Sequence, residues 1–200
     1  MTSIADTSTS DIAALHRRAL DATRPVVAAI SADQWVQVTP CAEWDVRALL
    51  NHVVAGNLWA AELANGHTID EVGDRLDGDQ LGAVPLDAYD QSSRAAAAAF
   101  DAPGALNRPC AVSYGPVPGS VYAGHRFLDV LIHGWDLAVA TGHDTHLDPA
   151  LVQACWDEIQ PQADALQASG MFGQPGSAAL DADPQTRILA ALGRRPNGRI

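Results

Sequence analysis

The stretch HRFLDVLIHGWDLA, residues 125–138, decides how this chain is interpreted. His125, Asp129 and His133 are each four positions apart, so on an α-helix they share one face, with Asp136 close to it. Most of the other side chains in the stretch are apolar. The pattern therefore predicts a helix, over about 120–141, that lies in a core and carries one stripe of histidine and aspartate.

The polar stripe has two interpretations. It could be the solvated face of a partly exposed helix, but such faces usually carry Glu, Arg and Lys rather than two histidines around an aspartate. Neutral imidazole and carboxylate one turn apart also form a two-ligand platform for Zn²⁺, Ni²⁺ or Fe²⁺. The residues alone leave both interpretations open.

A second helix supplies a possible third ligand. Asp45 is suited to cap its start, and Trp44 could pack onto Leu49. His52 lies at the edge of the apolar stripe of this helix, and Gly56 one turn on leaves room beside it. His52 could be an ordinary boundary residue. Opposite the polar stripe it would instead complete a three-ligand site with open positions, which is typical of catalytic metals.

Outside these two helices, the pattern predicts further helices and little else. Pro25 falls inside the first and could kink or end it, and Pro161 interrupts a later one. We expect an all-α four-helix bundle with additional short helices, forming one domain over residues 1–200. The further helices are expected over 11–30, 86–100, 149–169 and 184–192, with loops at 31–43 and 68–85 and a hairpin or extended connection at 106–119.

The other histidines are less persuasive as ligands. His16 adjoins two arginines and is expected at the surface. His67, His143 and His146 are expected in or near loops that follow helices.

Composition excludes several classes of function. A formal net charge of −12 argues against nucleic acid or an anionic membrane as partner. No apolar run approaches the ~18 residues of a membrane span. The first ten residues lack the basic region of a secretory signal, and Cys41, Cys110 and Cys155 form no close pair, so a reduced cytoplasm is expected. Motifs of serine hydrolases and nucleotide-binding proteins are missing from the sequence.

Three separated segments resemble a known family. TPCAEWDVRALLNHV at 39–53, HGWDLA followed by Thr141-Gly142, and RILAALGRRP at 187–196 are similar to the DinB/YfiT-like superfamily. The branch they resemble is actinobacterial and similar to the N-terminal domain of mycothiol-dependent maleylpyruvate isomerase.

This resemblance implies a DinB-like bundle that holds a divalent metal, Zn²⁺ or Ni²⁺, on His52, Asp129 and His133. His125, one turn earlier, is a rival to Asp129. The resemblance also implies mycothiol as cosubstrate, bound to the metal as thiolate, and an electrophilic small molecule as its partner. The implied function is a mycothiol-dependent S-transferase or isomerase, with a homodimer as one possible state.

Two alternative functions stay open. The first is a metal-dependent hydrolase, for which Asp136 or Glu43 could serve as general base. The second is a bundle without catalytic activity that binds a metal, a small ligand or another protein. Cys41 is not expected to be a catalytic nucleophile, because an external thiol would have that role.

Overall fold

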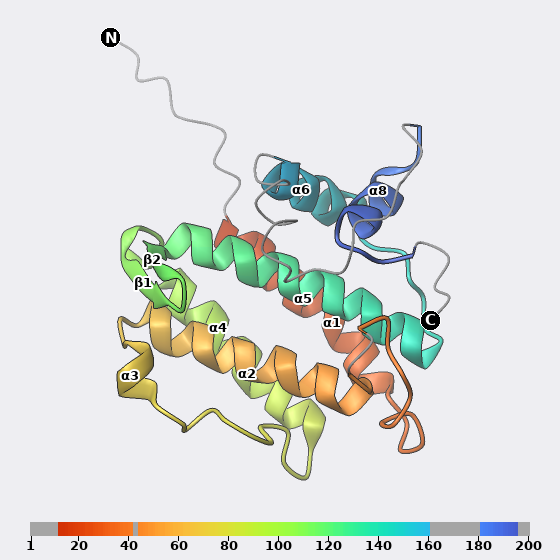
Figure 1. Ribbon diagram of the computed structural model, residues 1–200, viewed down its shortest axis with the longest axis horizontal. Helices are drawn as coiled ribbons and strands as arrows, with labels where there is room; N and C mark the ends of the chain where they lie inside the picture. The colour runs from red at the N-terminus through yellow and green to blue at the C-terminus, as the bar shows by residue number, and fades with distance from the viewer. Residues whose placement is uncertain (1–11, 42–43, 161–180, 196–200) are drawn as a thin grey trace.

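Four long helices form the body of the protein in the computed structural model, which describes residues 12–41, 44–160 and 181–195. Figure 1 shows α5 crossing the centre of the molecule, with α1 and α4 behind and α2 in front. The all-α prediction is confirmed, with one small antiparallel hairpin as the exception. The bounds of the four are Ile12–Ala29 for α1, Val46–Ala64 for α2, Pro85–Asp101 for α4 and Gly119–Thr141 for α5.

Shorter elements surround this body. A one-turn helix, α3 (Ile69–Val72), stands in the predicted loop after α2, and η1 (Ala105–Asn107) follows α4. β1 (Pro109–Val112) pairs with β2 (Gly115–Pro118), so of the two forms expected for this segment, a hairpin or an extended connection, the hairpin is the one present. α6 (Pro149–Ile159) and α8 (Pro184–Ala191) lie against each other on the far side of α5 from α2 (Figure 1).

The core is built around α5, whose apolar side chains are buried on nearly every side. Gly134 explains how close α1 comes: a Cβ at this position would lie 2.3 Å from Thr23 Oγ1. The Thr23 hydroxyl donates to the Val130 carbonyl over 3.3 Å, which joins the two helices inside the core. The dense apolar pattern that predicted this helix therefore reflects burial against several partners.

Several boundaries and placements differ from the sequence-based expectations. α1 continues through Pro25 to Ala29, so Pro25 does not end a shorter helix there. His16, expected at the surface, is fully buried beside Phe100, because its face of α1 turns toward α4 and α5 rather than outward with the neighbouring arginines. The predicted part of the later helix from Pro161 to Ser169 lies outside the described residues, as does Glu43.

The prediction that Asp45 caps the start of α2 is confirmed. Asp45 Oδ1 accepts a hydrogen bond from the Ala48 backbone N–H over 2.8 Å. The residue before it, Trp44, places its ring against His52, with 4.6 Å between the ring centroids. The entry into α2 therefore also fixes the surroundings of a candidate ligand.

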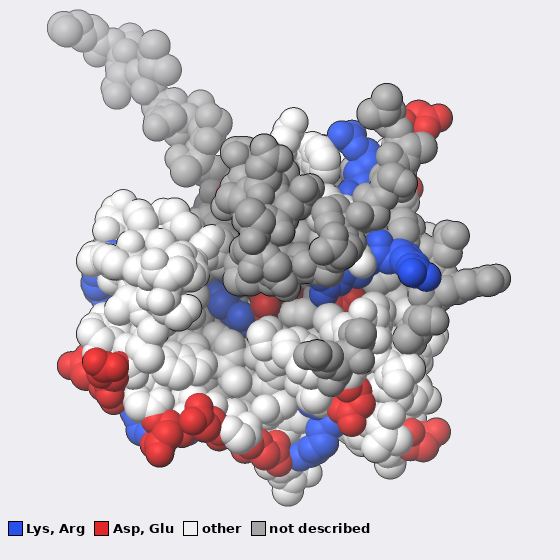
Figure 2. Space-filling view, in the orientation of Figure 1, with Lys and Arg blue, Asp and Glu red and all other residues white. Residues whose placement is uncertain are grey.

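The acidic charge of the chain is unevenly placed. Figure 2 shows acidic side chains along the edge formed by α3 and the loop after it, whereas the face over the hairpin carries mostly uncharged side chains. Among the described residues, no helix combines the length and apolar character needed to cross a membrane.

Candidate metal centre

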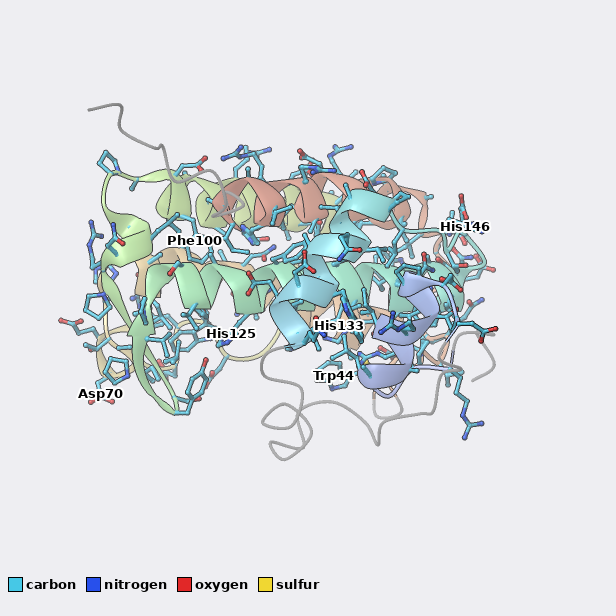
Figure 3. All side chains as sticks on the ribbon, turned by 90° about the horizontal axis from the view of Figure 1, so that it is seen from above. Trp44, Asp70, Phe100, His125, His133 and His146 are labelled. Carbon is cyan, nitrogen blue, oxygen red and sulfur yellow. The ribbon has the colours of Figure 1, made fainter. Side chains whose placement is uncertain are left out.

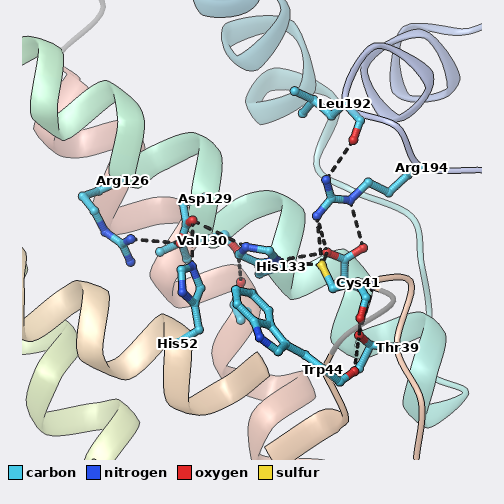
Figure 4. Close-up of polar contacts among 12 residues, drawn as sticks. Thr39, Cys41, Trp44, His52, Arg126, Asp129, Val130, His133, Leu192 and Arg194 are labelled. Carbon is cyan, nitrogen blue, oxygen red and sulfur yellow. Dashed lines mark hydrogen bonds and ion pairs between the residues drawn. The ribbon is translucent and has the colours of Figure 1, made fainter. Parts of the chain in front are cut away.

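Three candidate ligand atoms from two helices converge inside the bundle. His52 Nε2, from α2, lies 3.1 Å from Asp129 Oδ1, and His133 Nε2 lies 3.5 Å from the same oxygen (Figure 4). The ligand atoms of the three residues all lie within 4.8 Å of one another. Two imidazole nitrogens and one carboxylate oxygen are a donor set that suits Zn²⁺ or a similar divalent cation, so the residues fit the metal that the sequence suggested.

The two ring nitrogens of His133 have different partners, and Nε2 is the one directed toward Asp129. On its other side, Nδ1 lies 3.0 Å from Asp136 Oδ2, a geometry in which the ring donates to the carboxylate. Metal-binding histidines commonly donate their second N–H to a carboxylate, which fixes the ring and makes the ligating nitrogen a better donor to the metal. Asp136, which the sequence offered as a general base, is fully buried and occupied in this way.

Arg194 completes this buried chain from a distant part of the sequence. Its Nε and Nη2 contact the two carboxylate oxygens of Asp136 over 3.2 and 2.8 Å, and its Nη1 donates to the Leu192 carbonyl over 2.8 Å. Two-point pairing of this kind fixes the plane of a carboxylate as well as its charge. Although burial alone would raise it, the pKa of Asp136 is held below its usual value by His133 and Arg194.

A second buried arginine holds the ligand carboxylate. Arg126 Nη1 lies 2.9 Å from Asp129 Oδ2, so Oδ1 is the oxygen that faces the two histidines. The space that Gly56 leaves on α2 is filled by this guanidinium: a Cβ there would lie 2.4 Å from Arg126 Nη1. Asn57 Oδ1 accepts from Arg126 Nη2 over 3.2 Å, which anchors the arginine to α2.

The charges of this cluster are strongly coupled. Burial would raise the pKa of Asp129, but the charges of Arg126 and His133 hold it well below its usual value. Burial would likewise lower the pKa of His133, but the charge of Asp129 and hydrogen bonds to both aspartates raise it well above its usual value. Without a metal, His133 is therefore protonated, and its positive charge is stabilised by the carboxylates of Asp129 and Asp136.

A second group of possible ligands shares His133. Cys41, His133 and Asp136 also have ligand atoms within 4.8 Å of one another. Here, however, Arg194 Nη2 already lies 3.2 Å from Cys41 Sγ and 2.8 Å from Asp136 Oδ2. A cation would have to replace that guanidinium between Cys41 and the fully buried Asp136, whereas the side chains of His52 and Asp129 are 35% and 23% exposed. The first group is therefore the better candidate.

A pocket of about 430 Å³ adjoins one of the three candidate ligands, Asp129. It lies between α2, α5 and the hairpin, and Asp129 and Arg126 form part of its wall. His125, the rival ligand in the sequence analysis, faces this pocket and pairs with Tyr114 over 2.7 Å between its Nδ1 and the hydroxyl. Among the described residues, His125 belongs to neither group of possible ligands.

The remaining histidines lie away from the centre. Figure 3 shows His133 beside Trp44 and His125 nearer the N-terminal end of the same helix, α5. His146 lies beyond the C-terminal end of that helix. His67 pairs with Glu62, and His143 contacts Thr141 at the end of α5. These contacts agree with the roles near helix ends that were expected of them.

Sequence reasoning missed both arginines of the site. Arg126 lies three positions before Asp129, on nearly the same face of the predicted helix. That spacing was a usable signal. Arg194 gave no local signal, because 58 residues separate it from Asp136.

Comparisons with known proteins agree with the resemblance read from the sequence. The family model described as the mycothiol maleylpyruvate isomerase N-terminal domain matches residues 16–138, more than half of the chain. Two proteins described as uncharacterized, from the CDC 1551 and H37Rv strains of Mycobacterium tuberculosis, are each 37% identical over 191 residues. Those alignments cover 90% of this chain and 95% of the relatives.

Two solved structures share the fold. They are the crystal structures of the mycothiol-dependent maleylpyruvate isomerase and of a mutant in which a histidine is replaced by alanine. Each superposes with a TM-score of 0.65 at 14% identity, covering 100% of this chain and 98% of that chain. At this identity the likeness establishes a common fold.

Proposed function

The chain belongs to the mycothiol maleylpyruvate isomerase N-terminal domain family, and from this premise we propose that it is a divalent-metal-dependent enzyme that activates mycothiol for S-transfer or isomerisation. The observation that carries the proposal is the convergence of His52, Asp129 and His133 beside a pocket. Zn²⁺ or Ni²⁺ is the proposed metal, and the rest of the chain is proposed to serve this one site as a single domain.

A divalent cation at this site would bind the mycothiol sulfur and favour its thiolate form. The protein's own residues prepare the place. Asp136 accepts the Nδ1 proton of His133, which leaves the Nε2 lone pair, on the side of Asp129, to bind the metal. Arg126 turns Oδ1 of Asp129 toward the histidines, and the partly exposed side of His52 leaves an approach for a bulky, polar thiol.

Of the two residues considered as general base for hydrolysis, Asp136 is unavailable, and this supports the thiol function. A metal-activated water usually needs a nearby carboxylate to accept its proton. Asp136 is fully buried and paired with both His133 and Arg194, so it is not available to a water molecule at the pocket. We place the reaction in the cytoplasm, where a low-molecular-weight thiol stays reduced.

The first test measures the metal itself. The protein is purified without a chelator or a histidine tag and its metal content is determined. We expect about one divalent ion per chain, and strong loss of it in His52→Ala and His133→Ala. His125→Ala is the matched control, because that side chain faces Tyr114 and the pocket, and it should retain the metal.

The second test measures the thiol reaction with monochlorobimane. In this reaction the mycothiol sulfur bonds to the chloromethyl carbon, chloride leaves and the thiol proton passes to solvent. Metal-loaded protein should accelerate conjugation, and chelation or His133→Ala should abolish the acceleration. If loaded protein binds no mycothiol by calorimetry, the thiol function is wrong.

A further inference from the structure

The pocket beside the ligands has apolar walls that the mechanism above does not use. Trp59 and Leu63 of α2, Ile69 of α3, Val112 of the hairpin and Leu128 of α5 line most of it. Leu63 and Leu128 are buried, while Ile69 stands at the mouth and is 37% exposed. A cavity of about 430 Å³ with such walls is large enough for a ring compound and favours apolar surface.

The polar groups of the pocket carry almost no net charge. Arg126 and Asp129 neutralise each other at 2.9 Å. Burial lowers the pKa of His125 and raises that of Tyr122 to about 12, so both side chains are neutral near pH 7. A charged ligand would therefore lose its hydration here without gaining a partner of opposite charge.

Among the polar side chains that line the pocket, the Tyr114–His125 pair can hydrogen-bond a ligand. With the Tyr114 hydroxyl donating to Nδ1 of His125 over 2.7 Å, the neutral ring carries its proton on Nε2 and can donate it. This pair stands on the wall of the pocket, as does Asp129 of the candidate ligands. The pocket thus joins an apolar cavity, one neutral hydrogen-bonding pair and a ligand of the metal centre.

We propose that this pocket binds an uncharged aromatic molecule that carries a hydrogen-bond acceptor, with one end of that molecule beside Asp129. The observations that carry it are the apolar walls, the internal neutralisation of Arg126 by Asp129, and the Tyr114–His125 pair. That such a molecule is the electrophilic substrate rests on the proposed function. The binding itself does not.

The experiment uses two fluorescent naphthalene probes: prodan, which is uncharged and carries a ketone oxygen as hydrogen-bond acceptor, and anilinonaphthalenesulfonate, which is anionic. Titrations use full-length protein in a chelator, so that they report on the pocket without the metal. We expect saturable binding of the uncharged probe, at least about tenfold tighter than binding of the sulfonate. Equal or tighter binding of the sulfonate, or no saturable binding of the uncharged probe, overturns the proposal.

Two variants locate the probe. Ile69→Asp puts a carboxylate at the mouth of the pocket and should weaken the uncharged probe about tenfold or more. Ile69 is in the first turn of α3, where an aspartate is favourable, so the variant should keep the fold. Val36→Asp is the matched control, because Val36 is 79% exposed and does not line the pocket. Equal affinity in Ile69→Asp and wild type overturns the assignment.

These results separate the two proposals. Probe binding together with an absence of mycothiol conjugation leaves the pocket standing and removes the thiol function. Mycothiol conjugation without probe binding supports the thiol function and overturns the pocket proposal. With both present, metal-loaded protein should favour an uncharged aromatic electrophile over a dicarboxylate one in kcat/KM.

Discussion

Asp136 acts at the level of a single residue through its contact with His133. It touches neither the pocket nor the other two ligands, but its carboxylate accepts the Nδ1 proton of His133 over 3.0 Å and is held by Arg194. We interpret it as a positioning residue, which sets the ring orientation of a ligand and the nitrogen that carries the proton.

The first prediction concerns Asp136→Asn, which keeps the size of the side chain and removes its charge. Zn²⁺ affinity, measured by competition with a chromophoric chelator, should fall about 10–100-fold. The far-UV spectrum should not change. Thr141→Val is the control, since Thr141 is also buried on α5 but contacts Leu137 and His143. Unchanged affinity in Asp136→Asn would show that His133 needs no such partner.

Cys41 gives a second prediction at this scale. Its thiol lies 3.3 Å from Asp136 Oδ2 and 3.2 Å from Arg194 Nη2, on the side of His133 that faces away from Asp129. The nucleophile of the proposed reaction is an external thiol, so Cys41→Ser should keep most of the conjugation rate. A complete loss of rate, with metal content intact, would assign the nucleophile to Cys41.

At the scale of the elements, the α2–α5 interface decides whether the ligands meet. Gly56 is the position where the two helices admit the Arg126 guanidinium, and Arg126 in turn fixes Asp129. Glycine inside a helix costs about 1 kcal/mol relative to alanine, so its presence at this place needs a packing reason. The guanidinium is that reason.

The third prediction is that the effect of Gly56→Ala on the free energy of unfolding changes sign when Arg126 is replaced. In the wild-type background Gly56→Ala should destabilise the protein in urea, because the new Cβ would lie 2.4 Å from Arg126 Nη1. In an Arg126→Met background the same change should be neutral or stabilising, by up to about 1 kcal/mol from helix propensity. Additive effects in the two backgrounds would mean that Gly56 and Arg126 do not interact.

At the scale of the whole molecule, His16 links acidity to folding. The ring is fully buried in the core, and neither ring nitrogen has a hydrogen-bond partner among the described residues. Burial, together with the positive charges of Arg126 and Arg17, lowers its pKa from 6.5 to about 3, and the opposing charge of Asp129 is weaker. The folded protein therefore keeps His16 neutral at pH values where the unfolded chain protonates it.

The fourth prediction follows from that difference. Because the unfolded state binds the extra proton, stability is complete above about pH 6.5 and falls as the pH drops toward 3. From pH 7 to pH 5 this one group should remove about 2 kcal/mol from the free energy of unfolding. In His16→Leu, measured by urea unfolding with a chelator present, the loss over that interval should be smaller by this amount.

Thr23→Val provides the control for His16. Thr23 is also buried on α1 but does not titrate, so its variant should show the full wild-type loss. A loss in His16→Leu as large as in wild type would place the acid sensitivity in other groups.

The sequence by itself determined the all-α fold and the cap of α2, and it supplied the metal ligands that we propose. These features depend on local spacing: His and Asp four positions apart share a helix face whatever surrounds them, and Asp45 caps the turn that follows it. His52 was a possible third ligand from its place on the second helix, and the family resemblance implied the full set, because a ligand on another helix cannot be paired with Asp129 by spacing alone.

Only the tertiary structure decided what surrounds those ligands. It buried His16 beside Phe100, filled the space at Gly56 with Arg126, placed Arg194 on Asp136 and turned His125 toward Tyr114. Each of these contacts joins residues whose distance depends on how helices cross, and no periodicity along one helix records the rotation of its neighbour. The sequence therefore predicts which residues share a helix face, whereas only the tertiary structure shows which residues pack against that face.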